Sequence, residues 1–283
     1  MRKSVQAVLS SRSYSHTAWH VLNSVLRLHG GAASRFVAER ERGATAVVVI
    51  SGNRGLAGSF NGNIADAVIA YARENGLIPQ MNGGLETVNT HGDGSMVVVT
   101  LGTKVRDELI ARGMTVEADF LKSDVITSST EIEPLIRYLF DEYSSRSLKR
   151  VVLCYTDFES ALRQTVRIRT LLPLSLSEDP YLGVVHNNTH ASEDDKEEEY
   201  DFDQDQGSIL STVIPRILEA QLFQAVLESQ ASEHSARMIA MKNATEAASD
   251  MISELTLEYN KQRQSAITQE LAEIAASRMA LAG

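Results

Sequence analysis

The chain has little cysteine, no long apolar run and no excess of basic residues. Its one cysteine, Cys154, excludes a disulfide framework and any metal site built from several cysteines. The formal net charge of −10 at pH 7 argues against a general nucleic-acid binder, which needs a basic face. No apolar run approaches the roughly 20 residues needed to cross a bilayer. If the protein meets a membrane, we expect it to do so through a partner.

Proline and glycine are absent from most of the C-terminal part of the chain. No proline follows Pro215, and no glycine lies between Gly207 and Gly283. The residues between them are mostly Ala, Leu, Glu, Gln, Met and Lys, which lose least on entering a helix. We therefore predict one helix over residues 207–283, on the order of 100 Å long at about 1.5 Å per residue. No single globular core can bury a helix of that length.

Apolar residues along this predicted helix recur at alternating steps of three and four, which is typical of a coiled-coil seam. The predicted seam consists of Leu210, Val213, Ile217, Ala220, Gln224, Leu227, Ala231, His234, Met238, Met241, Thr245, Ala248, Ile252, Leu255 and Tyr259. Beyond Tyr259 the rhythm shifts to Ile267, Leu271 and Ile274, which indicates a change of supercoil or of partner. The alternative is an ordinary core helix with a long tail.

Residues 1–38 contain no acidic residue, and their arginines lie among many serines. This composition is typical of a mitochondrial transit peptide. The same stretch also carries apolar residues at steps of three and four, with polar residues filling the intervening positions. These apolar residues are Val5, Val8, Trp19, Leu22 and Leu26. We favour a helix over residues 1–42 that winds antiparallel around the C-terminal helix.

Residues 43–206 alternate between strand and helix patterns. The β-branched run at 44–50 predicts a strand buried on both faces. We predict further strands at 96–101, 150–155 and 166–174, and helices at 62–73, 104–111 and 130–143. The last helix has Thr130 and Glu133 at capping-box spacing. This alternation predicts a Rossmann-like α/β domain with a mostly parallel sheet, between the helical segments 1–42 and 207–283.

A glycine-rich loop follows the first predicted strand. Gly52, Gly55 and Gly58 are spaced three apart, which matches neither the dinucleotide fingerprint nor a Walker loop. A strand-to-helix turn can still offer backbone amides to an anion. One alternative is therefore a stand-alone nucleotide-binding protein or enzyme with a helical dimerisation tail. We favour a structural role for these glycines, because no lysine accompanies them.

Other candidate sites are weaker. His186 and His190 are four apart but lie in a loop-like stretch, so helical metal-ligand spacing does not apply. The acidic run at 192–206 lacks the glycine and ligand rhythm of a calcium-binding loop. No serine, histidine and acid set has the context of a nucleophile. We expect no catalytic residue, no cofactor and no metal in this chain alone.

Several stretches resemble a known family. Residues 232–245 (Ser-Glu-His-Ser-Ala-Arg-Met-Ile-Ala-Met-Lys-Asn-Ala-Thr), with 255–264 and 267–271, resemble the C-terminal helix of the γ subunit of F-type ATP synthases. Residues 51–61 are similar to its Ser-x-Asp-Arg-Gly-Leu-Cys-Gly…Asn motif, with Asn53 in place of Asp and Ala57 in place of Cys. Residues 7–14 and the Leu-Leu-Pro-Leu at 171–174 extend the resemblance. The basic helical stretch with which γ subunits usually open is absent here.

The resemblance implies a central shaft that rotates inside a ring of α and β subunits, attached at its base to ε and the membrane c-ring. Proton flow would drive ATP synthesis through it. The implied contacts with the β subunits are Arg237, Arg263, Gln264, Thr268 and Glu270. The implied structural residues are Gly52, Arg54, Gly55, Gly58, Asn61, Met238, Met241 and Tyr259. We expect the protein to lie at the cytoplasmic face of a bacterial membrane, with the mitochondrial inner membrane as the alternative location. An alternative for its function is a γ paralogue that no longer rotates.

Overall fold

The computed structural model describes residues 36, 38–77, 94–145, 147–174 and 206–282, with side chains from 214 to 279 in the last range. The helix predicted over 1–42 falls almost wholly outside the described residues, as do His186, His190 and most of the acidic run at 192–206. Contacts divide the chain into two units, Met1–Arg237 and Met238–Gly283. The predicted domain boundaries at 42/43 and 206/207 stay predictions.

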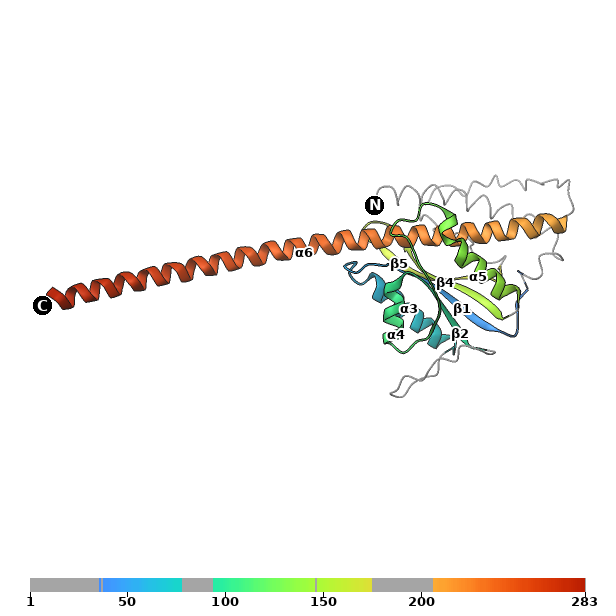
Figure 1. The fold of residues 1–283 in the computed structure, drawn as a ribbon, viewed down its shortest axis with the longest axis horizontal. Helices are drawn as coiled ribbons and strands as arrows, with labels where there is room; N and C mark the ends of the chain where they lie inside the picture. The colour runs from blue at the N-terminus through green and yellow to red at the C-terminus, as the bar shows by residue number, and fades with distance from the viewer. Residues whose placement is uncertain (1–35, 37, 78–93, 146, 175–205, 283) are drawn as a thin grey trace, which may run out of the picture. The chain divides into compact units, whose positions relative to one another are not determined.

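A five-stranded sheet with the order β3-β2-β1-β4-β5 forms the centre of the first unit (Figure 1). Its strands are β1 (Ala44–Ile50), β2 (Met96–Leu101), β3 (Val116–Phe120), β4 (Leu148–Phe158) and β5 (Gln164–Leu172). The pairings of β1 with β2, β1 with β4 and β2 with β3 are parallel, and β5 runs antiparallel to β4. The predicted mostly parallel sheet is confirmed. β4 and β5 both begin two residues before their predicted starts.

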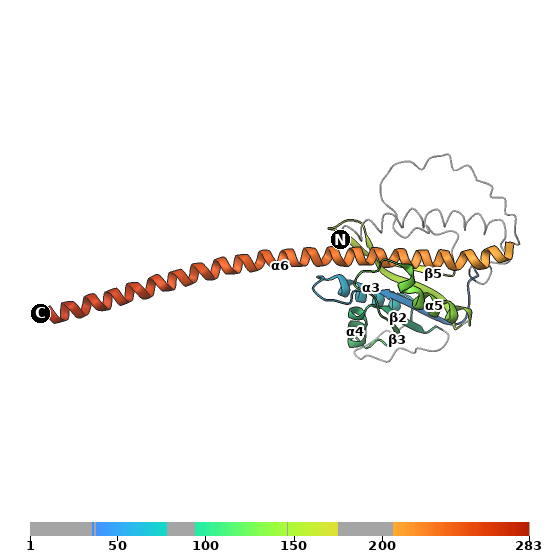
Figure 2. The ribbon, with the colours of Figure 1, turned by 45° about the horizontal axis from the view of Figure 1, so that its top comes forward.

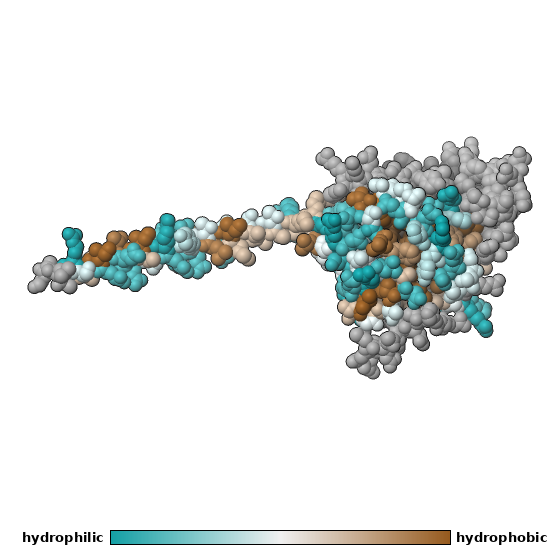
Figure 3. Space-filling model, viewed as in Figure 1, coloured by the Kyte–Doolittle hydropathy of each residue, from teal (hydrophilic) through white to brown (hydrophobic). Residues whose placement is uncertain are grey.

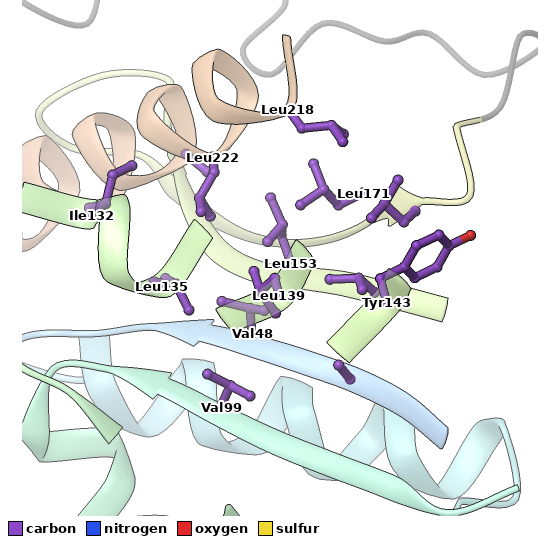
Figure 4. Packing of buried hydrophobic residues seen from close by; sticks show 14 of the residues in the cluster. Val48, Val99, Ile132, Leu135, Leu139, Tyr143, Leu153, Leu171, Leu218 and Leu222 are labelled. Carbon is purple, nitrogen blue, oxygen red and sulfur yellow. The ribbon is translucent and has the colours of Figure 1, made fainter. Parts of the chain in front are cut away.

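Helices cover both faces of this sheet (Figures 1 and 2). They are α3 (Phe60–Glu74), α4 (Thr103–Ala111), α5 (Glu133–Ser144) and the long α6 (Gln206–Ala282). Because side chains alternate along a strand, Val47 and Val49 of β1 belong to the core cluster with α3 and α4. Val48 packs in the opposite cluster with α5 and the first part of α6 (Figure 4). The strand at 44–50 is therefore buried on both faces, as predicted.

The predicted capping box of Thr130 and Glu133 at the start of α5 is wrong. A 3-10 turn at Ser129–Ile132 precedes the helix, and the Ser128 side chain accepts a hydrogen bond from the Thr130 amide at 3.3 Å. Glu131 Oε1 accepts from the Thr127 amide at 3.0 Å. The side-chain cap thus lies at the start of the 3-10 turn, and Pro134, which has no N–H, lies in the first turn of α5.

The C-terminal helix is confirmed as one element, α6, which contains Pro215. Within the first unit, its residues from Gln224 to Glu233 are all buried, polar ones included. The predicted seam residues Gln224, Leu227 and Ala231 are among these buried residues. The same segment also forms hydrogen bonds to β1 and β4 of the α/β domain.

In the second unit, described by itself, every residue from 241 to 279 is exposed. The predicted seam residues Met238, Met241, Ile252, Leu255 and Tyr259 are 48–66% exposed. Figure 3 shows apolar and polar groups alternating along this helix. Their pairing with residues 1–35 stays a prediction, since those residues lie outside the described part. Within the described residues, no helix is both long and apolar enough to span a bilayer.

Candidate functional site at the carboxyl edge of the sheet

The glycine loop leaves β1 at the edge where the parallel strands end. The Gly52 amide donates a hydrogen bond to Asn61 Oδ1 at 3.2 Å, which ties the loop to the start of α3. A Cβ on Gly52 would lie 2.8 Å from Glu233 Oε1 of α6, so a side chain at this position would displace the Glu233 carboxylate. Gly58 has φ +57°, where glycine carries no steric cost. The absence of a side chain at Gly52 therefore allows α6 to lie close to the end of β1.

A buried ion cluster lies beside this loop. Lys122, just after β3, donates from Nζ to the Ser51 carbonyl oxygen at 2.8 Å and to Glu233 Oε2 at 3.0 Å. Arg237 Nη2 donates to Glu233 Oε1 at 2.7 Å. The Lys122 and Glu233 side chains are 1% and 7% exposed. Both carboxylate oxygens of Glu233 are thus paired with a cation.

Backbone carbonyls and the neighbouring loop complete the cluster. Arg237 forms longer hydrogen bonds, both at 3.3 Å, from Nε to the Gly55 carbonyl and from Nη2 to the Arg54 carbonyl. The Asn53 side-chain amide donates to the Lys122 carbonyl. Arg54 forms an ion pair with Asp124 at the surface. The glycine loop, the loop after β3 and α6 are therefore joined through charged and polar groups.

The environment of Glu233 determines its protonation. Burial acts to raise the pKa of its carboxyl, but the charge of Lys122 and the hydrogen bonds from Arg237 and Lys122 outweigh burial, and the pKa is lowered from 4.5. The carboxylate is therefore ionised at neutral pH, as the ion cluster requires.

This lowered pKa predicts a pH dependence of stability. A carboxyl whose pKa is lower in the folded than in the unfolded chain stabilises the fold above the unfolded value and loses that contribution as the pH falls through the folded value. The difference in free energy of unfolding between wild type and Glu233→Gln should therefore be largest near pH 7 and shrink below pH 4.5. Urea denaturation of both variants across this range measures it.

His234 must be removed from that titration. Burial lowers its pKa from 6.5, while the charge of Glu233 acts to raise it, so His234 does not titrate alike in the two variants. Both variants are therefore compared in a His234→Gln background. A difference that stays constant from neutral pH to well below pH 4.5 would show that Glu233 is not held by the two cations.

Further polar contacts join α6 to the strand ends. Ser229 Oγ donates to the Ile50 carbonyl at the end of β1, and Ser232 Oγ donates to the Thr156 carbonyl of β4, both at 3.3 Å. The Ile126 amide donates to Gln230 Oε1 at 2.8 Å. Directional hydrogen bonds therefore hold this part of α6 against β1, β4 and the loop after β3.

The sequence-predicted residues fall into three places. Gly52, Arg54, Gly55, Gly58 and Asn61 lie in or next to the glycine loop, and Arg237 packs against that loop. The second unit contains Met238, Met241 and Tyr259, together with the exposed Arg263, Gln264, Thr268 and Glu270. Thr268 Oγ1 donates to the Gln264 carbonyl within the helix at 2.8 Å. The structure thus brings Arg237, but not the other four predicted contact residues, into the ion cluster.

Sequence reasoning missed Lys122 and Glu233. Glu233 stands four residues before Arg237, the spacing at which opposite charges pair on a helix, and this signal was available. Lys122 is 111 residues from Glu233 and carries no local signal.

The described residues contain no group of three or more His, Cys, Asp or Glu side chains placed to hold a metal ion. Cys154 is buried in β4, and burial raises the pKa of its thiol to about 12, so it is not a thiolate nucleophile. The arrangement defines the class of the protein: an α/β domain joined through a buried ion cluster to one long helix, α6.

Comparisons with known proteins identify this class further. A family model described as ATP synthase matches residues 1–281. The ATP synthase gamma chain of Pelotomaculum thermopropionicum is 32% identical over 281 residues, covering 99% of this chain and 89% of the relative. That of Herpetosiphon aurantiacus is 31% identical, with the same coverage of both chains. The chain therefore belongs to the ATP synthase gamma-chain family.

Solved structures are similar in fold. A chain of the Euglena gracilis mitochondrial ATP synthase (OSCP/F1/c-ring, rotational state 3) matches with a TM-score of 0.58 at 17% identity, covering 99% of this chain and 94% of that one. A chain of the Tetrahymena thermophila mitochondrial ATP synthase central stalk and c-ring structure matches with a TM-score of 0.55 at 16% identity, covering 86% and 96%. The α/β domain joined to a long helix is thus a fold these assemblies contain.

Proposed function

We propose that this chain is the central-stalk subunit of an ATP synthase and couples transmembrane proton flow to ATP synthesis by rotating within the catalytic head. The observation that carries the proposal is the family match over residues 1–281, together with gamma-chain relatives about 30% identical along nearly the whole chain. The α/β domain, continuous with the 77-residue helix α6, supports the same role.

The physical requirement on such a subunit is a coupling free energy between its orientation and the nucleotide affinity of each catalytic site. This coupling is reciprocal, so a torque on the shaft changes affinity and nucleotide turnover turns the shaft. A long helix transmits torque only if it is stiffened by packing and fixed to the part of the subunit that is driven. The polar contacts between α6 and the strand ends meet the second condition.

The proposed partners are the α and β subunits around the shaft, with ε and the membrane c-ring at its base. The chain itself would be non-catalytic, since the chemistry takes place in the head. Its proposed location is the cytoplasmic face of a bacterial membrane, peripheral and held by these partners. The bacterial origin of the gamma-chain relatives supports this location over the mitochondrial inner membrane.

Arg263, Gln264, Thr268 and Glu270 are the proposed contacts with the β subunits near the end of α6. Their exposure on the described helix supports this role. Arg237 remains a proposed contact, but its side chain is only 16% exposed and already binds Glu233. Substituting Arg237 would disturb the ion cluster as well as any contact, so Arg263 is the better residue to test.

Arg263→Gln should lower the rate of ATP synthesis by the assembled complex about threefold or more, because it removes one partner of a charged contact. The measurement is proton-driven ATP synthesis in vesicles that contain the complete enzyme. Lys261→Gln is the matched control, a neighbouring exposed cation outside the proposed contact, and should leave synthesis unchanged. Wild-type synthesis by the Arg263→Gln complex would remove Arg263 from the contact.

A further inference from the structure

The contact of α6 with the α/β domain changes character along the helix. Its first part packs apolar side chains, among them Ile217, Leu218 and Leu222, into the core cluster that contains α5 (Figure 4). From Ser229 onward the helix also contacts the domain through hydroxyl, amide and charged groups, between small apolar residues such as Ala231 and Ala236. The polar segment ends at Arg237, the last residue of the first unit.

These two kinds of contact resist different displacements. Apolar burial is non-directional, so a helix held by it alone can rotate or shift between neighbouring packings at modest cost. Hydrogen bonds and ion pairs lose their energy within a small displacement. A buried ion pair adds little net stability, because its charged groups lose their hydration. In some systems such a pair instead selects one arrangement of the chain over others.

Lys122 stands at the centre of the directional contacts. Its Nζ joins the end of β1, through the Ser51 carbonyl, to α6, through Glu233. Its own carbonyl is held by Asn53 of the glycine loop. A side chain on Gly52 would collide with the Glu233 carboxylate. The glycine loop, the loop after β3 and α6 thus meet at the Lys122 ammonium group, and the Lys122 side chain is only 1% exposed.

We propose that Lys122 is a positioning residue: its bonds to Glu233 and Ser51 fix the rotational and axial register of α6 on the α/β domain, so that torque passes between domain and helix without slip. This inference rests on the proposed rotor function. Arg237 supports Lys122 by holding the second Glu233 oxygen.

The decisive variant replaces the buried pair by apolar residues of similar size, Lys122→Met with Glu233→Leu. Such replacements often preserve or raise stability, whereas removing one partner leaves a buried charge. Arg237 loses its Glu233 partner in this variant, but its side chain is 16% exposed and still has the Gly55 and Arg54 carbonyls as hydrogen-bond acceptors. We expect the double variant to fold, assemble and hydrolyse ATP at the wild-type rate, while proton-driven ATP synthesis falls at least threefold. If the pair served stability alone, the double variant would also synthesise ATP at the wild-type rate, and that result would overturn the inference.

The matched control applies the same chemistry to the exposed pair formed by Arg112, which directly follows α4, and Asp66 of α3. Arg112→Met with Asp66→Leu should leave both hydrolysis and synthesis unchanged. Failure of the wild-type complex to synthesise ATP would count against the rotor function itself, which distinguishes that failure from failure of the register inference.

A second measurement does not depend on assembly. Spin labels on Arg137 of α5 and Arg216 of α6, both well exposed, report the register of the helix in the isolated full chain. We expect the distance distribution to broaden or shift in the Lys122→Met, Glu233→Leu variant relative to the otherwise unsubstituted labelled chain. An unchanged distribution would overturn the inference even if the variant failed to assemble.

Discussion

Gly102→Ala should lower the free energy of unfolding of the α/β domain by about 3 kcal/mol or more. Gly102 has φ +107°, and a Cβ there would lie 2.5 Å from the Ser51 carbonyl oxygen. The backbone conformation costs an L side chain about 1–3 kcal/mol, and forcing an extra carbon into a packed site costs about 1–3 kcal/mol more. Because the obstructing atom is backbone, it cannot rotate away. Urea denaturation followed by circular dichroism measures the change.

The same carbonyl accepts the hydrogen bond from Lys122, so Gly102→Ala should also displace the ion cluster. Gly55→Ala is the matched control, since a Cβ on Gly55 meets nothing within 4 Å. That substitution should change the free energy of unfolding by about 0.5 kcal/mol or less. Equal stabilities for the two variants would contradict the described approach of the β2–α4 turn to the end of β1.

Leu153→Ala should cost about 2–5 kcal/mol of unfolding free energy, the range for emptying a close-packed leucine site. Leu153 is 1% exposed in β4 and packs in the cluster that joins the sheet to α5 and α6 (Figure 4). Denaturant unfolding gives the value. Leu162→Ala, in the turn after β4 and 84% exposed, should cost about 0.5 kcal/mol or less. A Leu153→Ala protein as stable as Leu162→Ala would show that the core is not formed as described.

The parts of the fold that could be predicted are those in which burial dictates residue type locally. β1 and β2 are buried along their whole length, and their β-branched runs at 44–50 and 96–101 mark them to the residue. β3 was missed because it is a short edge strand with alternating half-buried and exposed residues, among them Glu117 and Asp119. An edge strand is defined by its neighbour, which local pattern does not reveal.

Only the Glu233–Arg237 part of the ion cluster, which lies within α6, was predictable. The contact of Lys122 with Glu233 depends on tertiary structure. The spacing of Glu233 and Arg237 is a helical signal, whereas Lys122 reaches Glu233 only after β3 has joined the sheet. The glycine spacing excluded a phosphate loop, but only the close approach of Glu233 explains Gly52. The seam spacing predicted that Gln224, Leu227 and Ala231 are buried, but periodicity alone did not reveal that the residues between them are buried as well.

Rotation of this chain inside an immobilised head tests the central claim most directly. Leu162→Cys offers an exposed attachment point for a visible probe on the α/β domain, and the buried Cys154 will not compete for the label. With the α and β subunits fixed to a surface, ATP should drive continuous rotation of the probe in one direction. A probe that stays still while the assembled head hydrolyses ATP would contradict the assignment of this chain as the rotor.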